Sequence, residues 1–373
     1  MDFAPGSDLK LLRKAIREFA EDIVAPQARI MEDTGRMPPE LPGVLAAQGL
    51  FGVCLPFACG GTRMTSLERL VTLEEVARIS PAAAVYLAAQ HTAAAAVLEG
   101  AREKADILPD LAAGRRTAAL ALSSGSPGLT CRITGDGSHR LDGNTAWCQG
   151  DAQPAFFLVE ARDAPGVPAL FILPHPTAGV HYGRLSSAGL RGSQAGPLVL
   201  SAACLPPASR LAGFRAGPAG DPVAAVHVLG FAACALGVMQ AALDAGLDFA
   251  RKRVLYGKAI AHLQAVQFRL ADMFADLEAG RLMAYQAASR FDQDKATPLD
   301  LYALHRFLKS AAVRNCRKAV EIFGGYGALK DFSAERCLRD AQALAAGGFP
   351  GFTPSGPGPL GPVLVPPASP FLL

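Results

Sequence analysis

Two short segments in the second half of the chain hold residue types that could bind an anion. Residues 251–258 read RKRVLYGK, and residues 324–327 read GGYG. A guanidinium fits phosphate oxygens, and glycine lets backbone approach a ligand closely. By composition alone, however, the first segment also fits a basic turn before a bundle helix, and the second an ordinary interhelical turn.

A long amphipathic helix follows the basic segment and would position it. Its apolar residues recur at the period of one buried helical face. They are Leu263, Val266, Leu270, Met273, Leu277 and Ala284, with Gly280 in the missing step. Charged residues such as Arg269 and Asp276 lie off this stripe, where water or a neighbouring chain could meet them.

Helical patterns also dominate residues 8 to about 115. We expect Pro26 to limit the first helix, Gly49 to follow the second helix as a glycine cap, and Ser66 to cap a later one. Short segments separated by glycine, proline and serine then run to about residue 220. Turns are expected at Asp136-Gly137 and Asp142-Gly143, and strands at residues 156–161, 169–173 and 197–200.

These patterns predict a mainly α fold with a central β domain. The expected parts are an N-terminal helical domain (1–117), a small antiparallel β-barrel or sandwich (118–220), a C-terminal four-helix bundle (221–345) and an irregular tail rich in proline and glycine (346–373).

Composition argues against several classes of protein. Half of the 373 residues are hydrophobic, so disorder is not the default for the body of the chain. The net charge is only +3 and no block of Lys and Arg occurs, which argues against a nucleic-acid surface. The eight cysteines are scattered without CxxC pairs. They predict reduced thiols of a cytoplasmic protein and no metal site.

Neither a secretory signal nor a membrane span is expected. The N-terminus becomes amphipathic and charged at once. Residues 223–239 are apolar for about the length of a span, but His227 and two glycines interrupt them and a polar amphipathic pattern follows directly. A buried bundle helix is the better interpretation.

Several motifs together resemble the acyl-CoA dehydrogenase family. Residues 321–341 (EIFGGYGALKDFSAERCLRDA) look like the family's GGxG…ExxxRDA signature without insertion or deletion. The segment RVLYGK at 253–258 and Gly192-Ser193 after Leu190-Arg191 fit the same pattern. The resemblance covers residues 9–345, and the order of helices, β domain and helical bundle is similar as well.

In that family FAD lies between the β domain and the C-terminal bundle, and a neighbouring subunit completes its site. The resemblance implies that Arg253 contacts the FAD pyrophosphate, with Tyr256 beside it and Gln264 near the dinucleotide. An arginine suits this role because its fork of donors fits phosphate oxygens. A solvated arginine at a helix end is the alternative.

The same resemblance implies further FAD contacts. Gly324, Gly325 and Gly327 would let backbone approach the adenosine-diphosphate part, and Trp147 would lie next to the flavin ring. A tryptophan of the β-domain core is the alternative for Trp147.

The chain also departs from the family pattern. A flavin-contacting loop is shorter here, with Ser123 as the remaining hydroxyl, and Gln149 stands where a threonine would bond the flavin. Glu321 replaces a usual glutamine, and a carboxylate close to FAD phosphates would be unfavourable unless it points away.

The largest departure concerns the catalytic base, a glutamate that removes the α-proton of an acyl thioester. Its commoner position is Gly348 here, and its alternative position is His227, followed by Val228 in place of an arginine. Removing a general base typically costs about a hundred- to ten-thousand-fold in rate. His227 could replace it, because an imidazole titrates near pH 6.5, but its apolar surroundings favour a packed core histidine.

The tail breaks with the rest of the chain. No charged residue follows Asp340, and residues 349–373 hold eight prolines, which exclude a helix. In the family a helix and further FAD contacts lie there. Either the reading frame was lost near Ala346 or a divergent tail exists, and resequencing the 3′ end of the gene decides between them.

Three functions follow from the resemblance. The first is an FAD-dependent α,β-dehydrogenase of an acyl-CoA or acyl-carrier thioester, whose turnover the missing carboxylate puts in question. The second is a non-catalytic relative that acts as a binding or scaffold subunit. The third is a flavin monooxygenase-like enzyme, which needs no carboxylate base. The family further implies a homodimer or homotetramer, and electron-transfer flavoprotein as the partner of an active enzyme.

Overall fold

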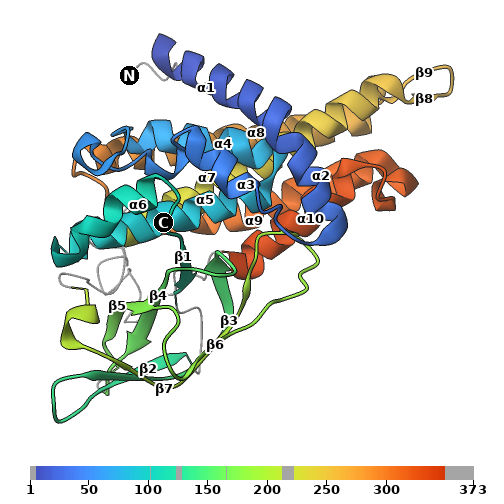
Figure 1. The fold of residues 1–373 in the computed structure, drawn as a ribbon. Helices are drawn as coiled ribbons and strands as arrows, with labels where there is room; N and C mark the ends of the chain where they lie inside the picture. Colours follow the sequence, from blue (N-terminus) through green and yellow to red (C-terminus); the bar gives the residue numbers. More distant parts are fainter. Residues whose placement is uncertain (1–5, 101, 123–127, 165, 212–221, 349–373) are drawn as a thin grey trace, which may run out of the picture.

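A computed structural model describes residues 6–100, 102–122, 128–164, 166–211 and 222–348. Layers of helices lie over a smaller strand-rich part (Figure 1). The predicted mainly α fold with a central β part is confirmed. The division into domains at residues 118 and 221 stays a prediction, and the tail from residue 349 lies outside the described residues.

The N-terminal helices are α1 Ser7–Phe19, α2 Ala25–Thr34, α3 Leu41–Ala47, α4 Ser66–Ile79, α5 Pro81–Gly100 and α6 Leu108–Ala112. The expectation that Pro26 limits the first helix is wrong. A π-helical turn, Ala20–Val24, joins α1 to α2, and the Ala25 N–H bonds to the Ala20 carbonyl. Pro26 therefore lies in the first turn of α2, where its missing N–H is not needed.

Two capping residues mark the boundaries of neighbouring helices: Gly49 follows α3, and Thr65 precedes α4. Gly49 follows α3 with a φ of +70°, the left-handed conformation expected there. At the start of α4 the cap is Thr65, one residue before the predicted Ser66. The Thr65 hydroxyl accepts a hydrogen bond from the Glu68 N–H, and the Glu68 carboxylate accepts one from the Thr65 N–H. This reciprocal pair satisfies two donors that a serine one position later could not reach.

The strands are β1 Ala118–Ala121, β2 Leu129–Ile133, β3 His139–Gly150, β4 Phe156–Arg162, β5 Pro168–Pro174, β6 Val180–Tyr182 and β7 Gly196–Leu205. They form one sheet in the order β1-β4-β2-β3-β7-β6, with β5 beside β4 and β1 also paired to β3. The sheet is mixed and not purely antiparallel, because β4 runs parallel to β1 and β2. The β2–β3 hairpin separates β1 from β4 in the sequence, and β3 pairs antiparallel with both β1 and β2.

The turn expected at Asp142-Gly143 is a bulge inside β3. The register against β7 shifts between Leu141 and Gly143, and Gly143 has a φ of +119°. The Asp142 carboxylate accepts a hydrogen bond of 2.7 Å from the Ala202 N–H of β7. This bond links the two strands where the ladder is interrupted, so β3 continues through the site instead of turning.

The second helical part comprises α7 Pro222–Lys252, α8 Gln264–Asp292, α9 Pro298–Phe323 and α10 Ser333–Ala343. Helix α7 is central, because α4, α5, α8, α9 and α10 all contact it. By length and composition α5 and α7 could each span a membrane, but 89% of the most apolar window of each is buried. Both are core helices of this fold.

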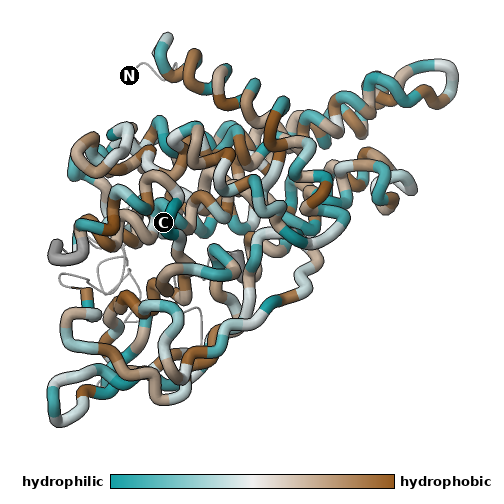
Figure 2. Tube along the Cα trace, viewed as in Figure 1, coloured by the Kyte–Doolittle hydropathy of each residue, from teal (hydrophilic) through white to brown (hydrophobic). Residues whose placement is uncertain are grey.

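A two-stranded hairpin, β8 Val254–Leu255 and β9 Lys258–Ala259, connects α7 to α8. Its tip residues Tyr256 and Gly257 have φ values of +53° and +76°, as a tight hairpin turn requires. The hairpin and the start of α8 project from the body of the molecule (Figure 1). Hydrophobic and hydrophilic residues alternate along this projecting arm (Figure 2).

Candidate functional site

The two segments whose residue types could bind an anion meet in the folded chain. The Arg253 guanidinium carbon lies 5.1 Å from the centre of the Tyr326 ring, which belongs to the GGYG segment. An aromatic cluster fixes this ring: Phe249 at the end of α7 stacks on Phe323 with centroids 4.1 Å apart, and Tyr326 packs edge-on against Phe332. Because Arg253 is exposed and forms no ion pair among the described residues, its donors are free to bind an external anion.

Backbone is accessible at the GGYG segment, which folds as a short 3-10 helix, Gly324–Ala328. Gly324 has a φ of +58°, and a Cβ built on Gly324 or Gly325 would meet no atom within 4 Å. A Cβ on Gly327 would lie 2.6 Å from the Val320 carbonyl oxygen. Gly327 therefore serves packing against α9, whereas Gly324 and Gly325 leave open space for a ligand.

The other predicted residues of this end of the molecule are exposed. Tyr256 is 93% exposed at the hairpin tip, and Gln264 is the exposed first residue of α8. The Glu321 carboxylate pairs with Arg269 at 3.2 Å and with Arg317 at 3.6 Å. These two cations balance its charge, which removes the conflict expected between a carboxylate and a bound phosphate.

Trp147 and Gln149 lie together at the end of β3. The Trp147 Nε1 donates to the Gln149 Oε1 at 3.2 Å, and the Gln149 Nε2 donates to the Ser193 carbonyl at 2.7 Å. Trp147 is half-buried against the helical core, so one part of its indole stays open. Ser123, the remaining predicted contact, lies outside the described residues.

The two groups of predicted residues occupy different ends of the chain. Strand β3, which carries Trp147, belongs to the β part, whereas the hairpin beside Arg253 projects at the far end of α8 (Figure 1). One chain therefore places the Arg253–GGYG segment and the Trp147–Gln149 pair in separate parts of the fold: β3 lies in the sheet, and the hairpin that follows Arg253 projects from the helical part.

Neither expected base position holds a carboxylate. Gly348 ends a π-helical turn, Leu344–Gly348, and has no side chain. His227 is 8% exposed on α7, where burial above all, and then His305 and Arg69, lower its pKa to about 3. An imidazole with this pKa is neutral at pH 7 but is a weak base.

Sequence reasoning missed a set of buried polar residues around α5. Gln90 holds both backbone groups of Ala118 in β1, with distances of 3.0 Å and 2.8 Å. The His91 Nε2 lies 2.7 Å from the Leu50 carbonyl, and Arg69 of α4 is 1% exposed. The consecutive polar residues Gln90-His91-Thr92 in an alanine-rich helix were the available signal, because such side chains need partners inside the core.

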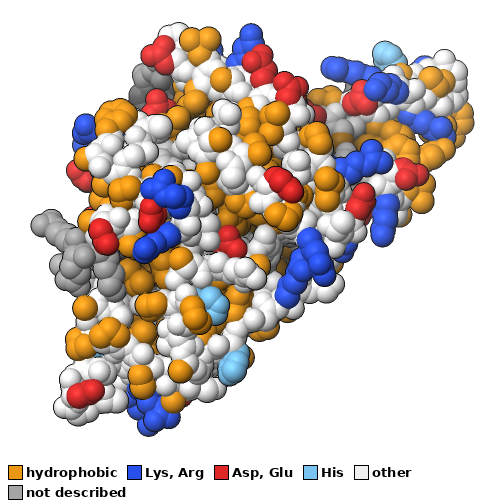
Figure 3. Space-filling view, viewed as in Figure 1, with side chains coloured by type: hydrophobic (Ala, Val, Ile, Leu, Met, Phe, Trp, Pro, Cys, Tyr) orange, Lys and Arg blue, Asp and Glu red, His pale blue; other side chains and the backbone are white. Residues whose placement is uncertain are grey.

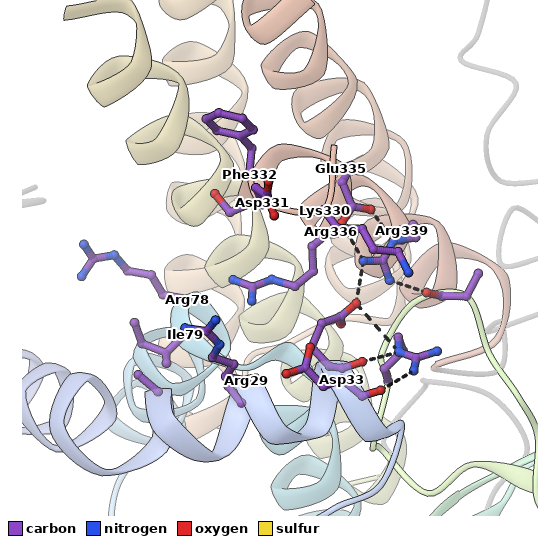
Figure 4. A pocket seen from close by; sticks show the side chains of 16 residues that line it. Arg29, Asp33, Arg78, Ile79, Lys330, Asp331, Phe332, Glu335, Arg336 and Arg339 are labelled. Atoms are coloured by element: carbon purple, nitrogen blue, oxygen red, sulfur yellow. Dashed lines mark hydrogen bonds and ion pairs between the residues drawn. The ribbon is translucent and has the colours of Figure 1, made fainter. Parts of the chain in front are cut away.

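A polar cavity of about 900 Å³ lies between α2, the end of α4 and α10. Arg29 and Arg336 line it from α2 and α10 (Figure 4), and basic side chains also mark the surface of the molecule (Figure 3). The Arg339 guanidinium forms ion pairs with Glu335 at 2.6 Å and with Glu32 at 2.7 Å. None of the sequence-predicted cofactor residues lines this cavity.

Family models match most of the helical parts of the chain. The model for the acyl-CoA dehydrogenase N-terminal domain matches residues 6–115, and that for the acyl-CoA dehydrogenase C-terminal domain matches residues 227–348.

Curated relatives match almost the whole chain. An acyl-CoA dehydrogenase of Bacillus subtilis is 33% identical over 352 residues, which is 89% of this chain and 92% of the relative. The caffeyl-CoA reductase-Etf complex subunit CarC of Acetobacterium woodii is 30% identical, over 90% of this chain and 93% of the subunit.

Solved structures share the fold. Butyryl-CoA dehydrogenase from Megasphaera elsdenii has a TM-score of 0.82 at 26% identity and covers 92% of this chain and 95% of its own. A glutaryl-CoA dehydrogenase from Mycobacterium smegmatis, in complex with FADH2, has a TM-score of 0.83 at 19% identity, over 92% of this chain and 91% of its own. The second likeness is one of fold alone.

Proposed function

The chain belongs to the acyl-CoA dehydrogenase family, and on this premise we propose that it is an FAD-binding oxidoreductase of acyl-CoA or acyl-carrier thioesters. One observation carries the proposal: Arg253 and the GGYG segment come together, the guanidinium has no ion pair among the residues that the structure describes, and the glycine backbone is open. A buried ion pair or a filled loop at this place would have excluded a phosphate ligand.

These residues would hold the two ends of FAD. Arg253 offers a fork of donors to the pyrophosphate, and the backbone at Gly324 and Gly325 lets the adenosine part approach. Trp147 offers its indole to the flavin ring, and the bond to Trp147 fixes the amide of Gln149 beside it. Bound FAD supplies hydride acceptance from the β-carbon of the thioester.

The chain's own contribution to proton removal is weak. The buried His227 imidazole, with a pKa near 3, has little affinity for a proton, and Gly348 has no side chain that could accept one. We therefore expect slow dehydrogenation. A second function, binding without turnover as a scaffold subunit of the same fold, is favoured by this same absence of a carboxylate.

We further propose that FAD is shared between two copies of the chain, in a homodimer or homotetramer. Trp147 lies on β3 of the sheet, whereas Arg253 lies beside the hairpin that projects from the helical part, and this separation supports a second copy as the source of one of the two groups. Helix α8 offers a surface for such contact: Phe268 and Leu282 are 62% and 51% exposed, although the opposite face of α8 is buried in the bundle. Exposed apolar stripes of this kind mark interaction surfaces.

Electron-transfer flavoprotein is the partner we propose for reoxidation, supported by the name of the related Acetobacterium woodii subunit, which belongs to a reductase–Etf complex. A cytoplasmic location is part of the proposal and is supported by eight cysteines that are all free thiols.

Absorbance at flavin wavelengths tests the proposal. The purified chain should be yellow, and anaerobic addition of an acyl-CoA panel should bleach it slowly. Colourless protein that binds no added FAD contradicts the proposal. A flavin that no thioester reduces supports the scaffold function, and bleaching only by an external reductase, with oxygen consumption, supports a monooxygenase-like enzyme.

A further inference from the structure

A path of hydrogen bonds leads from helix α10 to the indole of Trp147. The buried Asp340 carboxylate of α10 accepts a hydrogen bond of 2.6 Å from the Leu190 N–H, and the Ser193 N–H donates to the Leu190 carbonyl at 3.0 Å. The Ser193 carbonyl accepts from the Gln149 Nε2 at 2.7 Å, and the Gln149 Oε1 accepts from the Trp147 Nε1 at 3.2 Å. The path therefore joins the C-terminal helices to the end of β3 through one short turn.

This turn, residues 190–193, has a conformation that its own residues do not favour. Leu190 has a φ of +52°, which is rare for a bulky side chain. Gly192 has a φ of +84°, and a Cβ at this position would lie 2.8 Å from the Met31 Cβ. A backbone of this kind persists only where the surrounding structure holds it, and it is often found at functional sites.

Asp340 holds the buried side of the turn. Leu190 is 1% exposed and Asp340 is 4% exposed, and among the described residues this carboxylate supplies the acceptor for the Leu190 N–H. Contacts nearer the surface hold the neighbouring residues: the Arg339 Nη1 donates to the Ala188 carbonyl, and the Arg191 Nε donates to the Glu32 carbonyl. Without Asp340 the Leu190 N–H would be buried and unsatisfied, which favours a different turn.

The far end of the path fixes the orientation of the Gln149 amide. An indole N–H can only donate and a carbonyl can only accept, so the amide oxygen must face Trp147 and the amide nitrogen must face Ser193. Ser193 uses one of the two N–H groups on Nε2, and the second has no acceptor among the residues that the structure describes. The path thus leaves one oriented donor beside Trp147.

We propose that Asp340 is a positioning residue for the flavin contact, because it holds the turn whose Ser193 carbonyl fixes the Gln149 amide and, through it, the Trp147 indole. The inference rests on the proposed function, in which these two side chains adjoin the flavin ring. Asp340 acts through the Leu190 N–H and not through a contact of its own with the cofactor. A donor beside a flavin ring favours the reduced, electron-rich form, so the path tunes the electron affinity of the bound flavin.

The single tryptophan reports on this path without any cofactor. In the FAD-free, full-length protein Asp340→Ala should shift the Trp147 emission to longer wavelength and increase its quenching by acrylamide, because the indole loses its fixed partner. Asp340→Asn keeps an acceptor oxygen and should retain the emission of the unaltered protein. Arg184→Met is the matched control: Arg184 donates to the Gly35 carbonyl at 2.9 Å from the exposed segment before the turn, and its loss should leave the emission unchanged.

The FAD-loaded protein supplies a second readout. Asp340→Ala should lower the affinity for FAD about three- to tenfold, as the loss of one hydrogen bond predicts, and should make the midpoint potential of the bound flavin more negative. Asp340→Asn should change neither quantity. A role of Asp340 in stability alone would lower the melting temperature without changing the potential.

A double substitution tests whether the path is continuous. Gln149→Met breaks it at the far end, next to Trp147. If Asp340 acts on the indole through Gln149, Asp340→Ala should add little to the change in emission that Gln149→Met causes alone, because residues in one network have non-additive effects. Additive changes would show that the two residues act separately.

The measurements separate the inference from the proposed function. Emission and flavin potential that are unchanged in Asp340→Ala, or additive changes in the double variant, overturn the inference and leave the proposed function standing. If Asp340→Ala does not fold, Asp340→Leu, which fills the site without an acceptor, is measured in its place. An altered emission in Asp340→Asn overturns the inference equally. If the unaltered protein binds no FAD, the proposed function falls, and the role of Asp340 towards the flavin falls with it.

Discussion

The Arg253 guanidinium faces the ring of Tyr326 with 5.1 Å between its carbon and the ring centre. This contact joins the end of α7 to the loop after α9 and keeps the cation at the surface. A guanidinium held by a π face and not by a carboxylate retains its hydrogen-bond donors for another acceptor. The contact therefore explains how one arginine can be positioned by the fold and still be available to a phosphate.

Replacing Arg253 should weaken FAD binding more than it weakens the fold. Arg253→Met removes a charge-assisted contact of about 1.5–3 kcal/mol, which is about a ten- to hundredfold loss of affinity. Titration of the apoprotein with FAD, followed by flavin fluorescence, measures it. Arg251→Met is the matched control, because Arg251 is exposed and lies two residues away in the same basic segment. Equal losses in both variants would mean that only net charge matters.

Substitutions at two glycines of the GGYG segment should have different effects, because Gly327 is packed against α9 and Gly325 adjoins open space. Gly327→Ala places a Cβ 2.6 Å from the Val320 carbonyl, so we expect it to destabilise the fold by about 1–3 kcal/mol. Gly325→Ala meets no atom within 4 Å and should leave the free energy of unfolding unchanged while lowering FAD affinity. Chemical denaturation and FAD titration of both variants check this. A destabilised Gly325→Ala variant would contradict it.

The strands that could be predicted from the sequence are those whose own residues are typical of strands. Residues 156–161 and 169–173 were predicted to within about one residue of β4 and β5, because β-branched and aromatic residues follow one another there. Strand β1 reads AALA, which is typical of a helix. It is a strand only because Gln90 and the neighbouring strands β3 and β4 hold it, and such distant partners leave no local pattern.

The candidate site, like the sheet, could be predicted where its residues carry a local pattern and not where distant parts of the chain meet. The motifs singled out Arg253 and the GGYG segment, but the contact of Arg253 with Tyr326 depends on how α7 and α9 pack, which one sequence does not fix. Arg69 was missed for a related reason. Its neighbours on α4 form a pattern typical of a surface helix, and only the packing of α7 across this helix buries it.

Exposed apolar side chains on α8 should mediate self-association. Phe268 and Leu282 lie on one face of the helix. We proposed that two copies share the cofactor, so Phe268→Asp with Leu282→Asp should convert the proposed oligomer to monomer and abolish FAD retention. Sedimentation velocity and flavin absorbance measure both effects. Leu299→Asp, at an apolar residue 44% exposed on α9, should change neither. A monomeric variant that keeps FAD would refute cofactor sharing.

Stability should fall in weak acid. Burial lowers the pKa of His91 and His227 to about 3 and that of His305 to about 4, from the ordinary value of 6.5 for histidine. The unfolded chain therefore binds more protons, and stability present above pH 6.5 is lost as the pH falls towards 4, by about 2 kcal/mol per histidine at pH 5. Asp340 opposes this, because burial raises its pKa to about 6 and its protonation favours the folded state below that pH.

Urea unfolding between pH 7 and pH 5, followed by circular dichroism, should show a net loss of several kcal/mol. His305→Phe, which keeps a ring against Phe231, should reduce this loss by about one histidine's share. His262→Gln changes an exposed histidine and should leave the pH dependence as it was. A stability that is flat from pH 7 to pH 5 would show that the buried histidines are paired in a way that tolerates the charge.

A carboxylate at residue 227 should restore proton abstraction. His227→Glu places a base where the family has an alternative one, and we expect flavin reduction by a bound acyl-CoA to accelerate about a hundred- to ten-thousand-fold. His227→Ala should leave the slow rate unchanged, because an imidazole with a pKa near 3 contributes little as a base. Val228→Glu is the matched control, since it buries a carboxylate one position along α7 without directing it to the same point. Anaerobic stopped-flow spectroscopy measures all three rates. A marked loss of rate in His227→Ala would establish the histidine as the base and overturn our reading of this position.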